Sequence, residues 1–464
     1  MLTKGSQDAL AEAHAAYNAR NSSSLQAYLS SCKFLPGGNT RTVLHALPFP
    51  LTFASGSGCT LTSIDGDTYI DFLGEYTAGI YGHNNPTIRA AINEALDKGW
   101  SFGGNNMYEK ELARLVCERF RPAIELVRFT NSGTEANMMA VAAALAWTGR
   151  KKILVFDKGY HGATLSFRST PSGHVEETKK DVNLPHEWVM GTYNDVEKTE
   201  EVLSTTPPES LAAILVEPML GSGGAIAGSL PFLRFLRSYA SSHGALLIFD
   251  EVMTSRLSHR GLGYKIGIHP DMMTLGKWVG GGMSFGAFGG RRDIMGMFDP
   301  RNGSLAHAGT FNNNVVSMAA GCAGCKILDE ETTDRLNDLG ERMKQMVQDV
   351  IDKHVDSEVP RTNGHDSTHL SNGEEITTQP QHSDTVPKMW ISGIGSILAI
   401  HFASSSMQPT LQSLYYHHML TEGIYLAERG FMALNIETNL EHVQAFVAAT
   451  GQFVEKYRDL IHGA

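Results

Sequence analysis

Lys277 has the strongest case for chemistry of any residue in this sequence. It lies in the segment DMMTLGKWVGGGMSFGAFGG, between a short apolar stretch and three consecutive glycines. A lysine among apolar residues and bare backbone is poorly solvated, and this favours the neutral amine over the ammonium ion. A neutral amine forms a Schiff base with a carbonyl compound and carries protons during the reaction. The segment therefore predicts amine-based covalent catalysis.

Two carboxylates close apolar strands in the same part of the chain. Asp250 ends the run ALLIFD, where a buried charge is costly unless it meets a cation. The protonated ring nitrogen of a pyridine cofactor is such a cation, and Asp250 would keep that ring an electron sink. Glu217 ends the run AAILVE, and the pattern fits both a place near the cofactor and a structural pair. Glu251 points to the other side of its strand and is expected to be structural.

Three polar turns are suited to the rest of such a cofactor. In FTNSGTEAN, Ser132, Gly133 and Thr134 precede a helix whose N-terminal N–H groups and dipole bind phosphate, although a serine there is also an ordinary helix cap. Tyr160 in GYHGAT follows a strand and is placed to stack on a flat heterocycle, with core packing as the alternative. Thr310 in HAGTFNNN lies in a second turn suited to phosphate.

A buried sheet is needed to position these residues. From about 125 to 325, the apolar runs LVRFT, KILVF, AAILVEP, ALLIFDE and SFGAFGG alternate with helical stretches. Such strands indicate an α/β sheet covered on both faces, with functional residues at the strand ends. The fold class predicted is α/β, with a large domain built on a mostly parallel sheet flanked by helices and a smaller α+β domain.

The length of 464 residues exceeds what one hydrophobic core usually organises. Residues 1–85 are expected to form an N-terminal arm and part of the small domain, 86–328 the large cofactor-binding domain, and 329–464 the rest of the small domain. Within the last, residues 356–388 are polar and predict a disordered insertion. Outside the large sheet, the pattern predicts a ribbon over 51–75, a strand at 396–402, and helices at 7–32, 86–98, 108–120, 329–353, 407–422 and 439–460.

Charge and cysteine content narrow the class of protein. The 38 basic and 49 acidic residues give a net charge of −11 without a basic stripe, which argues against nucleic acid and anionic membranes as partners. No apolar run near the N-terminus suits a signal peptide or a membrane span, so a cytoplasmic location is expected. Cys322 and Cys325 lie in MAAGCAGCKIL, whose spacing favours a buried helix over a redox pair. No metal site is expected.

Taken in order, SGTEAN, YHG, Asp250, Lys277 and GTFNNN resemble the class III aminotransferases of the fold-type-I pyridoxal-phosphate enzymes over nearly the whole chain. The resemblance implies that Lys277 carries pyridoxal 5'-phosphate as a Schiff base. It implies that Asp250 contacts the ring nitrogen. Phosphate binding would fall to Ser132, Gly133 and Thr134.

The same resemblance implies roles for three further residues. Tyr160 would stack on the cofactor ring, Val252 would pack beneath it, and Thr310 would reach the phosphate of the neighbouring subunit's cofactor. The enzyme would then be a homodimer with active sites at the subunit interface. The sequence departs from the family after Asp-Glu-Val, where it runs MTSRL instead of a Gly-Phe-Arg or Gly-x-Gly-Arg turn, so substrate contacts of that loop are not carried over.

Within the family, PGGNTRTV, GEYTAGIYGH and VMTSRL resemble the aromatic β-amino-acid (β-phenylalanine) aminotransferases most, and the glutamate-1-semialdehyde 2,1-aminomutase branch next. Arg41 and Arg429 fall where the first group keeps arginines near its substrate, and a guanidinium suits a carboxylate. A surface or interface role is the alternative for both. The expected activity is ping-pong transfer of an amino group from a β-amino acid to a 2-oxoacid. Alternatives are an aminomutase-like isomerase and an amine or ω-amino-acid transaminase.

Overall fold

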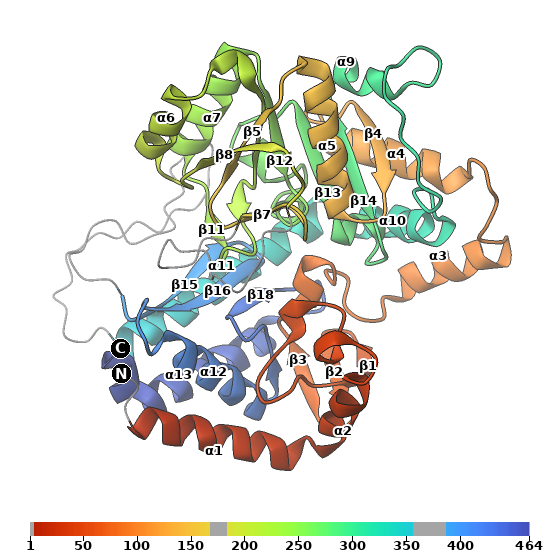
Figure 1. Cartoon of the computed structure of the whole chain (residues 1–464). Helices are drawn as coiled ribbons and strands as arrows, with labels where there is room; N and C mark the ends of the chain where they lie inside the picture. Colours follow the sequence, from red (N-terminus) through yellow and green to blue (C-terminus); the bar gives the residue numbers. More distant parts are fainter. Residues whose placement is uncertain (1–3, 168–182, 356–386, 464) are drawn as a thin grey trace. The chain divides into compact units, whose positions relative to one another are not determined.

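The computed structural model describes residues 4–167, 183–355 and 387–463 (Figure 1). The described residues form two compact units. Pro86–Asn337 make one unit, and the described residues before Pro86 and from Asp338 onward make the other. Helix α11 (Glu330–His354) begins in the first unit and ends in the second. The insertion expected at 356–388 lies outside the described residues, except for its last two positions.

A seven-stranded sheet forms the centre of the Pro86–Asn337 unit (Figure 1). Its strands are β4 (Leu126–Thr130), β5 (Lys152–Phe156), β8 (Glu187–Gly191), β9 (Leu211–Val216), β12 (Leu246–Asp250), β13 (Met272–Gly276) and β14 (Gly286–Gly290). Their order is β4-β14-β13-β12-β9-β5-β8, and only β14 runs antiparallel to its neighbours. The structure therefore confirms the mostly parallel sheet. It also shows that SFGAFGG supplies the antiparallel strand.

Helices cover both faces of this sheet because its strands are apolar on both sides. Along β12, Leu246 and Ile248 pack into the core under α5 (Gly133–Thr148), and Leu247 and Phe249 pack into the core under α6 and α7. By this alternation Asp250 points to the α5 face. Besides α5, the helices of eight or more residues that lie within the described part of this unit are α3 (Pro86–Asp97), α4 (Met107–Arg119), α6 (Val196–Ser204), α7 (Leu230–His243) and α10 (Val315–Ile327).

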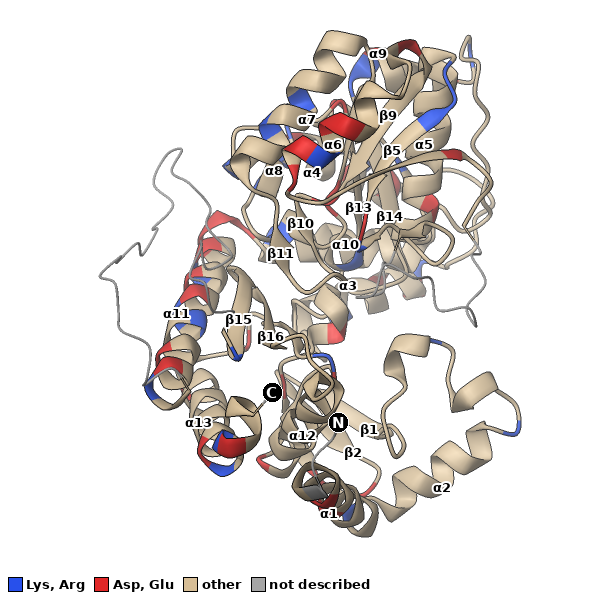
Figure 2. Ribbon diagram, turned by 60° about the vertical axis from the view of Figure 1, so that its left-hand side comes forward, with Lys and Arg blue, Asp and Glu red and all other residues tan. Residues whose placement is uncertain are grey.

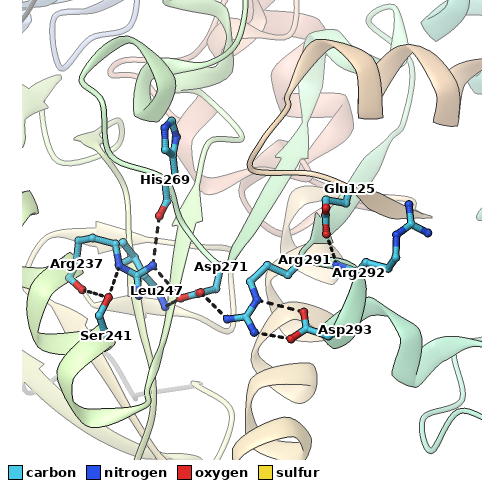
Figure 3. Close-up of polar contacts among 9 residues, drawn as sticks. All are labelled: Glu125, Arg237, Ser241, Leu247, His269, Asp271, Arg291, Arg292 and Asp293. Carbon is cyan, nitrogen blue, oxygen red and sulfur yellow. Dashed lines mark hydrogen bonds and ion pairs between the residues drawn. The ribbon is translucent and has the colours of Figure 1, made fainter.

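Asp271 fastens the amino end of β13 to its surroundings (Figure 3). Its Oδ2 accepts hydrogen bonds from the Leu247 N–H and from Arg237 Nη1, both at 2.8 Å, and its Oδ1 accepts one from Arg291 Nη1 at 3.0 Å. Arg237 belongs to α7, and Arg291 directly follows β14. The carboxylate thus ties two strands and a helix to β13, at the opposite end of that strand from Lys277. This cluster supports the frame and is remote from the candidate chemistry.

The second unit contains two small sheets. One joins β1 (Phe53–Ser57), β2 (Thr60–Ser63), β3 (Thr68–Asp71) and β17 (Ile424–Tyr425), and the other joins β15 (Met389–Ile394), β16 (Ile397–Phe402) and β18 (Phe431–Ala433). The expected ribbon and the strand at 396–402 are confirmed, and β15 is a partner strand that the sequence pattern did not predict. Besides α11, the helices of ten or more residues in the described part of this unit are α1 (Lys4–Arg20), α2 (Ser22–Ser31), α12 (Gln408–Thr421) and α13 (Leu440–His462).

The helix predicted over 7–32 is two helices, α1 and α2, because the chain breaks at Asn21. This residue has φ −118° and ψ 46°, outside the helical region, and its side-chain amide donates to the Tyr17 carbonyl at 2.9 Å. Asparagine readily bonds to nearby backbone in this way, which competes with a continuous helix. The helices expected at 86–98, 108–120, 329–353, 407–422 and 439–460 are confirmed as α3, α4, α11, α12 and α13.

Cys322 and Cys325 lie on α10, and both are buried and free of disulfides. Burial raises the pKa of the Cys322 thiol to about 12 and that of Cys325 to about 11. A thiol with a raised pKa is a poor nucleophile at neutral pH. The structure therefore confirms the prediction of core cysteines.

Helix α11 carries both acidic and basic residues along its length (Figure 2). In the described part of the chain, no helix combines the length and the apolar character that crossing a membrane requires.

Candidate active site

The candidate residues of the Pro86–Asn337 unit follow the ends of parallel strands. Asp250 ends β12, Glu217 follows β9, and Lys277 follows β13. Ser132 comes two residues after β4, and Tyr160 lies in the short strand β6 (Gly159–Tyr160), which follows β5. Parallel strands have their carboxyl ends at one edge of the sheet, so residues far apart in sequence meet there.

Lys277 has an unusual backbone conformation. Its φ is +54°, in the left-handed region that residues other than glycine seldom adopt. The next residue, Trp278, is fully buried, donates from Nε1 to Ser255 Oγ at 2.9 Å, and packs 4.7 Å from the guanidinium of Arg119. Packing of Trp278 thus holds the strained backbone in place. Strain maintained in this way is frequent at functional sites.

Asp250 is the centre of a buried hydrogen-bond network. Its Oδ2 lies 2.8 Å from both Asn137 Nδ2 and His161 Nδ1, and its Oδ1 accepts from the Val252 N–H at 3.0 Å. Asn137 Oδ1 in turn accepts from Thr274 Oγ1 at 2.8 Å. Because an ionised carboxylate only accepts hydrogen bonds, His161 Nδ1 must carry a hydrogen. The network orients the carboxylate, which has remaining lone pairs for a cationic ring N–H.

The N-terminus of α5 has the features of an anion site. Ser132 caps the helix, with its Oγ accepting from the Glu135 N–H at 3.2 Å. Among the described residues, the N–H groups of Gly133 and Thr134 donate to no partner, as expected for the first turn of a helix. A Cβ at Gly162 would collide with the Thr134 side chain, so this glycine lets the YHG segment approach the turn closely. These donors are suited to a phosphate.

Val252 packs against two glycines that belong to different segments. A Cβ at Gly133 would lie 2.9 Å from Val252 Cγ2, and a Cβ at Gly276 would lie 3.2 Å from its Cγ1. Gly276 immediately precedes Lys277. The structure therefore brings the α5 turn, the segment after Asp250 and the end of β13 to one place, as the sequence predicted for a single site.

Glu217 fixes the backbone beside Tyr160. Its Oε1 accepts from the Tyr160 N–H at 3.0 Å and its Oε2 from the Gly221 N–H at 2.8 Å, while the Tyr160 side chain remains 38% exposed. Burial raises the pKa of Glu217 to about 7. His161 lowers this pKa, and the negative charge of Asp250 raises it. Glu217 therefore acts electrostatically on the same network as Asp250.

Glu251 serves the loop on the other side of the sheet. It is fully buried, and it accepts hydrogen bonds from the N–H groups of Leu262 at 2.7 Å and Gly263 at 2.8 Å. Burial raises the pKa of this carboxyl to about 7. Among the described residues, the hydrogen bonds to its carboxylate all come from the segment after β12, at Thr254, Leu262 and Gly263, in agreement with the structural role expected for it.

Thr310 is exposed, and it hydrogen-bonds to none of the other candidate residues in the described part of the chain. Its loop is nevertheless tied to the α5 turn, because Asn131 Nδ2, one residue before Ser132, donates to Asn312 Oδ1 at 3.1 Å. The structure thus places Thr310, itself exposed, on a loop that the Asn312 side chain fixes to the α5 turn.

Arg41 and Arg429, from the second unit, meet at one aromatic ring. Arg41 Cζ lies 5.8 Å and Arg429 Cζ 5.6 Å from the ring centre of Tyr76, which stacks on Phe431 at 5.9 Å. Arg41 Nη1 also pairs with Glu75 Oε1 at 2.6 Å. Two arginines that the sequence singled out separately are therefore parts of one cationic and aromatic cluster.

Sequence reasoning missed Asn137, His161 and Thr274 as parts of the site. Asn137 lies one helical turn after Gly133, so the spacing of SGTEAN places it on the same side of α5. His161 lies in the quoted YHG motif without an assigned role, and Thr274 is the polar residue in the apolar strand MMTLG. A polar side chain inside a buried strand was the available signal, since such groups are nearly always hydrogen-bonded.

Known proteins resemble this chain in sequence and in fold over most of its length. The model of the aminotransferase class-III family matches residues 44–365. A β-phenylalanine transaminase of Variovorax paradoxus is 43% identical over 456 residues, 96% of each chain. A crystal structure of a β-phenylalanine aminotransferase from that organism has a TM-score of 0.87 and 41% identity, covering 98% of this chain and 99% of that one. Glutamate-1-semialdehyde 2,1-aminomutase 2 of Lachnoclostridium phytofermentans is 35% identical over 430 residues, 88% of this chain and 93% of that one.

The fold is that of the fold-type-I pyridoxal-phosphate transaminases. The chain belongs to the class III aminotransferase family, and its cofactor is pyridoxal 5'-phosphate. The site fits this cofactor, because α5 offers donors for a phosphate and Asp250 offers a buried, oriented acceptor. The family implies an amino donor and a 2-oxoacid as substrates.

Proposed function

We propose that this enzyme transfers the amino group of an aromatic β-amino acid to a 2-oxoacid by a ping-pong mechanism. The likeness to the Variovorax β-phenylalanine transaminase supports this substrate class. The observation that carries it is the cluster at Tyr76, where Arg41 and Arg429 contact one aromatic ring. Guanidinium groups recognise carboxylates, and an aromatic ring gives an apolar surface beside them.

Pyridoxal phosphate, when bound, supplies an electron sink for the electron pair that remains when the substrate carbon loses its proton. We assign Lys277 Nζ to hold the cofactor covalently. The same nitrogen, Lys277 Nζ, would be the group that takes up and returns the proton at the substrate carbon. Asp250 would accept a hydrogen bond from the ring nitrogen. The Ser132 hydroxyl and the N–H groups of Gly133 and Thr134 would bind the phosphate.

Tyr160 and Val252 are assigned to the two faces of the cofactor ring, the first by stacking and the second by packing. Glu217 holds Tyr160 in position through its backbone N–H, so we keep Glu217 among the residues that shape the cofactor site. Arg41 and Arg429 are assigned to the substrate carboxylate. Substitution of Arg41 is therefore the most direct test of the substrate class.

A homodimer follows from the proposed role of Thr310, which would bind the phosphate of the partner's cofactor. Asn106 Nδ2 donates to the Asn313 carbonyl at 2.8 Å, so the segments that carry Met107 and Phe311 run side by side. Met107 is 69% exposed and Phe311 65% exposed. These two exposed apolar side chains, on segments joined to the Thr310 loop, support the proposed subunit interface. The free cysteines of the described chain support a cytoplasmic location.

The proposed reaction predicts a complete first half-reaction with a β-amino acid. Purified enzyme incubated with 3-amino-3-phenylpropanoate should convert its bound cofactor to pyridoxamine phosphate, because the amino group stays on the cofactor until a 2-oxoacid arrives. The absorbance spectrum measures this conversion, and adding 2-oxoglutarate or pyruvate should reverse it. An enzyme that converts with no β-amino acid in a panel would not have the proposed substrate class.

Replacing Arg41 with alanine should change the substrate preference. The loss of a charged contact to a carboxylate costs about 2–5 kcal/mol, so kcat/KM for a β-amino acid should fall by roughly two orders of magnitude. The matching amine without a carboxylate, 1-phenylethylamine, should be far less affected. The ratio of the two kcat/KM values in parent and variant is the measurement, and an unchanged ratio would mean that Arg41 is not a carboxylate clamp.

An isomerase is the second candidate, because an aminomutase is 35% identical over most of the chain. An aminomutase returns the amino group to the same carbon skeleton and needs no oxoacid acceptor. Incubation with one amino substrate and no acceptor separates the two activities. Many turnovers per site would support the isomerase, whereas a transaminase stops after one conversion of its cofactor.

A further inference from the structure

The segment that carries Tyr76 has a rare backbone conformation. Gly74, Glu75, Tyr76 and Thr77 have φ values of 54°, 47°, 52° and 80°, so four consecutive residues lie in the left-handed region. Residues with side chains visit this region singly and seldom in succession. A turn of this kind persists only where its surroundings impose it, and such turns are frequent where function needs a fixed geometry.

Asp71 and His83 hold the left-handed turn. Asp71 is buried, its Oδ1 accepts from the N–H groups of Leu73 at 2.8 Å and Gly74 at 3.1 Å, and its Oδ2 lies 2.9 Å from His83 Nε2. A Cβ at Gly74 would collide with the Ala433 carbonyl oxygen, so only glycine begins the turn without displacing β18. The backbone that leads into Glu75 and Tyr76 is therefore anchored by Asp71 and by close packing on β18.

The anchored turn contacts Arg41 in two ways. Glu75 Oε1 pairs with Arg41 Nη1 at 2.6 Å, and the ring centre of Tyr76 lies 5.8 Å from Arg41 Cζ. The Tyr76 hydroxyl also donates to the Val43 carbonyl at 3.2 Å, which attaches the arm to the turn two residues after Arg41. Within the arm, Asn39 Oδ1 accepts from the Arg41 N–H at 3.1 Å. Glu75 thus holds one nitrogen of the Arg41 guanidinium, Nη1, through a single carboxylate oxygen.

We propose that Glu75 is a positioning residue that determines preference for carboxylated substrates. It holds the Nη1 edge of Arg41 against the turn, while Tyr76 supports the guanidinium plane, so that the other N–H groups of Arg41 are presented in a fixed direction for a carboxylate. Preorganising a binding group in this manner lowers the entropy lost on binding. The inference rests on the proposed function, in which Arg41 binds the substrate carboxylate.

The size of the effect follows from the exposure of the pair. The side chains of Arg41 and Glu75 are 44% and 55% exposed, and ion pairs so exposed are weak. Glu75→Gln should therefore lower the ratio of kcat/KM for 3-amino-3-phenylpropanoate to that for 1-phenylethylamine by about two- to fivefold. The change should be in KM for the carboxylated donor, with kcat preserved. The dissociation constant of 3-phenylpropanoate, a carboxylate without an amine, should rise by the same factor in calorimetric titration of the holoenzyme.

Three further variants complete the test. Glu422→Gln, at an exposed carboxylate after α12, is the matched control and should leave the ratio unchanged. In the Arg41→Ala background, Glu75→Gln should have no further effect on the ratio, because the two residues act through one contact. Should Glu75→Gln fold poorly, Glu75→Asp keeps the charge with a shorter reach and should give a smaller loss in the same direction.

The outcomes separate this inference from the function on which it rests. An unchanged or increased ratio in Glu75→Gln, with a lowered ratio in Arg41→Ala, would overturn the positioning role while leaving Arg41 as the clamp. A loss that persists in the Arg41→Ala background would also overturn it. An unchanged ratio in Arg41→Ala itself would instead count against the proposed function.

Discussion

Lys277→Ala should yield a folded protein with no measurable turnover. Without its Nζ, the enzyme loses both the covalent attachment of the cofactor and the group that moves the proton at the substrate carbon. Acid–base catalysis by a positioned side chain contributes about 10²–10⁴-fold, so kcat should fall by about a thousandfold or more. The fold should survive, because alanine at φ +54° meets the same backbone cost that lysine already bears.

Three measurements check the Lys277 prediction. Thermal unfolding should show a transition close to that of the parent, steady-state assays should show the loss of kcat, and absorbance should show whether cofactor is still bound. Lys265→Ala removes an exposed lysine of the same unit and should retain parental activity. Near-normal turnover of Lys277→Ala would contradict the assignment of this residue.

Asp250→Asn should lower kcat by at least about a hundredfold, because the ring nitrogen of the cofactor would lose its anionic partner. The hydrogen-bond network adds a second reason. Asn137 Nδ2 and His161 Nδ1 both donate to Oδ2 of Asp250. If the new side-chain amide points its NH₂ at these two donors, donor meets donor. If it points its oxygen at them, its NH₂ meets the Val252 N–H, which is also a donor. Either orientation disturbs the site.

Asp271→Asn is the matched control for Asp250, because it also neutralises a buried carboxylate of the same sheet. Its partners are Arg237, Arg291 and the Leu247 N–H, at the opposite end of β13 from Lys277 (Figure 3). This variant should be less stable to heat, with a parental kcat for the folded enzyme. If Asp250→Asn showed only the same loss of stability and a parental kcat, Asp250 would be a structural residue and not the partner of the cofactor.

Much of the site was predictable because its residues follow local rules. Lys277 directly follows a buried strand, Asp250 ends one and Ser132 precedes a helix, and the order of apolar runs and turns is visible in sequence. Glu251 was correctly separated from Asp250 because neighbouring residues of a strand point to opposite faces. The roles assigned to all the site residues, Lys277 and Asp250 included, and the domain boundaries stay predictions.

The sequence by itself determined the class of chemistry, since a lysine in bare backbone, a strand-end carboxylate and a phosphate-suited turn are encoded in short segments. Only the tertiary structure decided which distant residues complete the site. Asn137, His161 and Thr274 join Asp250 from three separate elements. The contact of Arg41 and Arg429 with Tyr76, and the left-handed turn that carries Glu75, depend on the packing of a whole unit. Local patterns record what a segment prefers, whereas such contacts depend on how segments far apart in the chain are packed together.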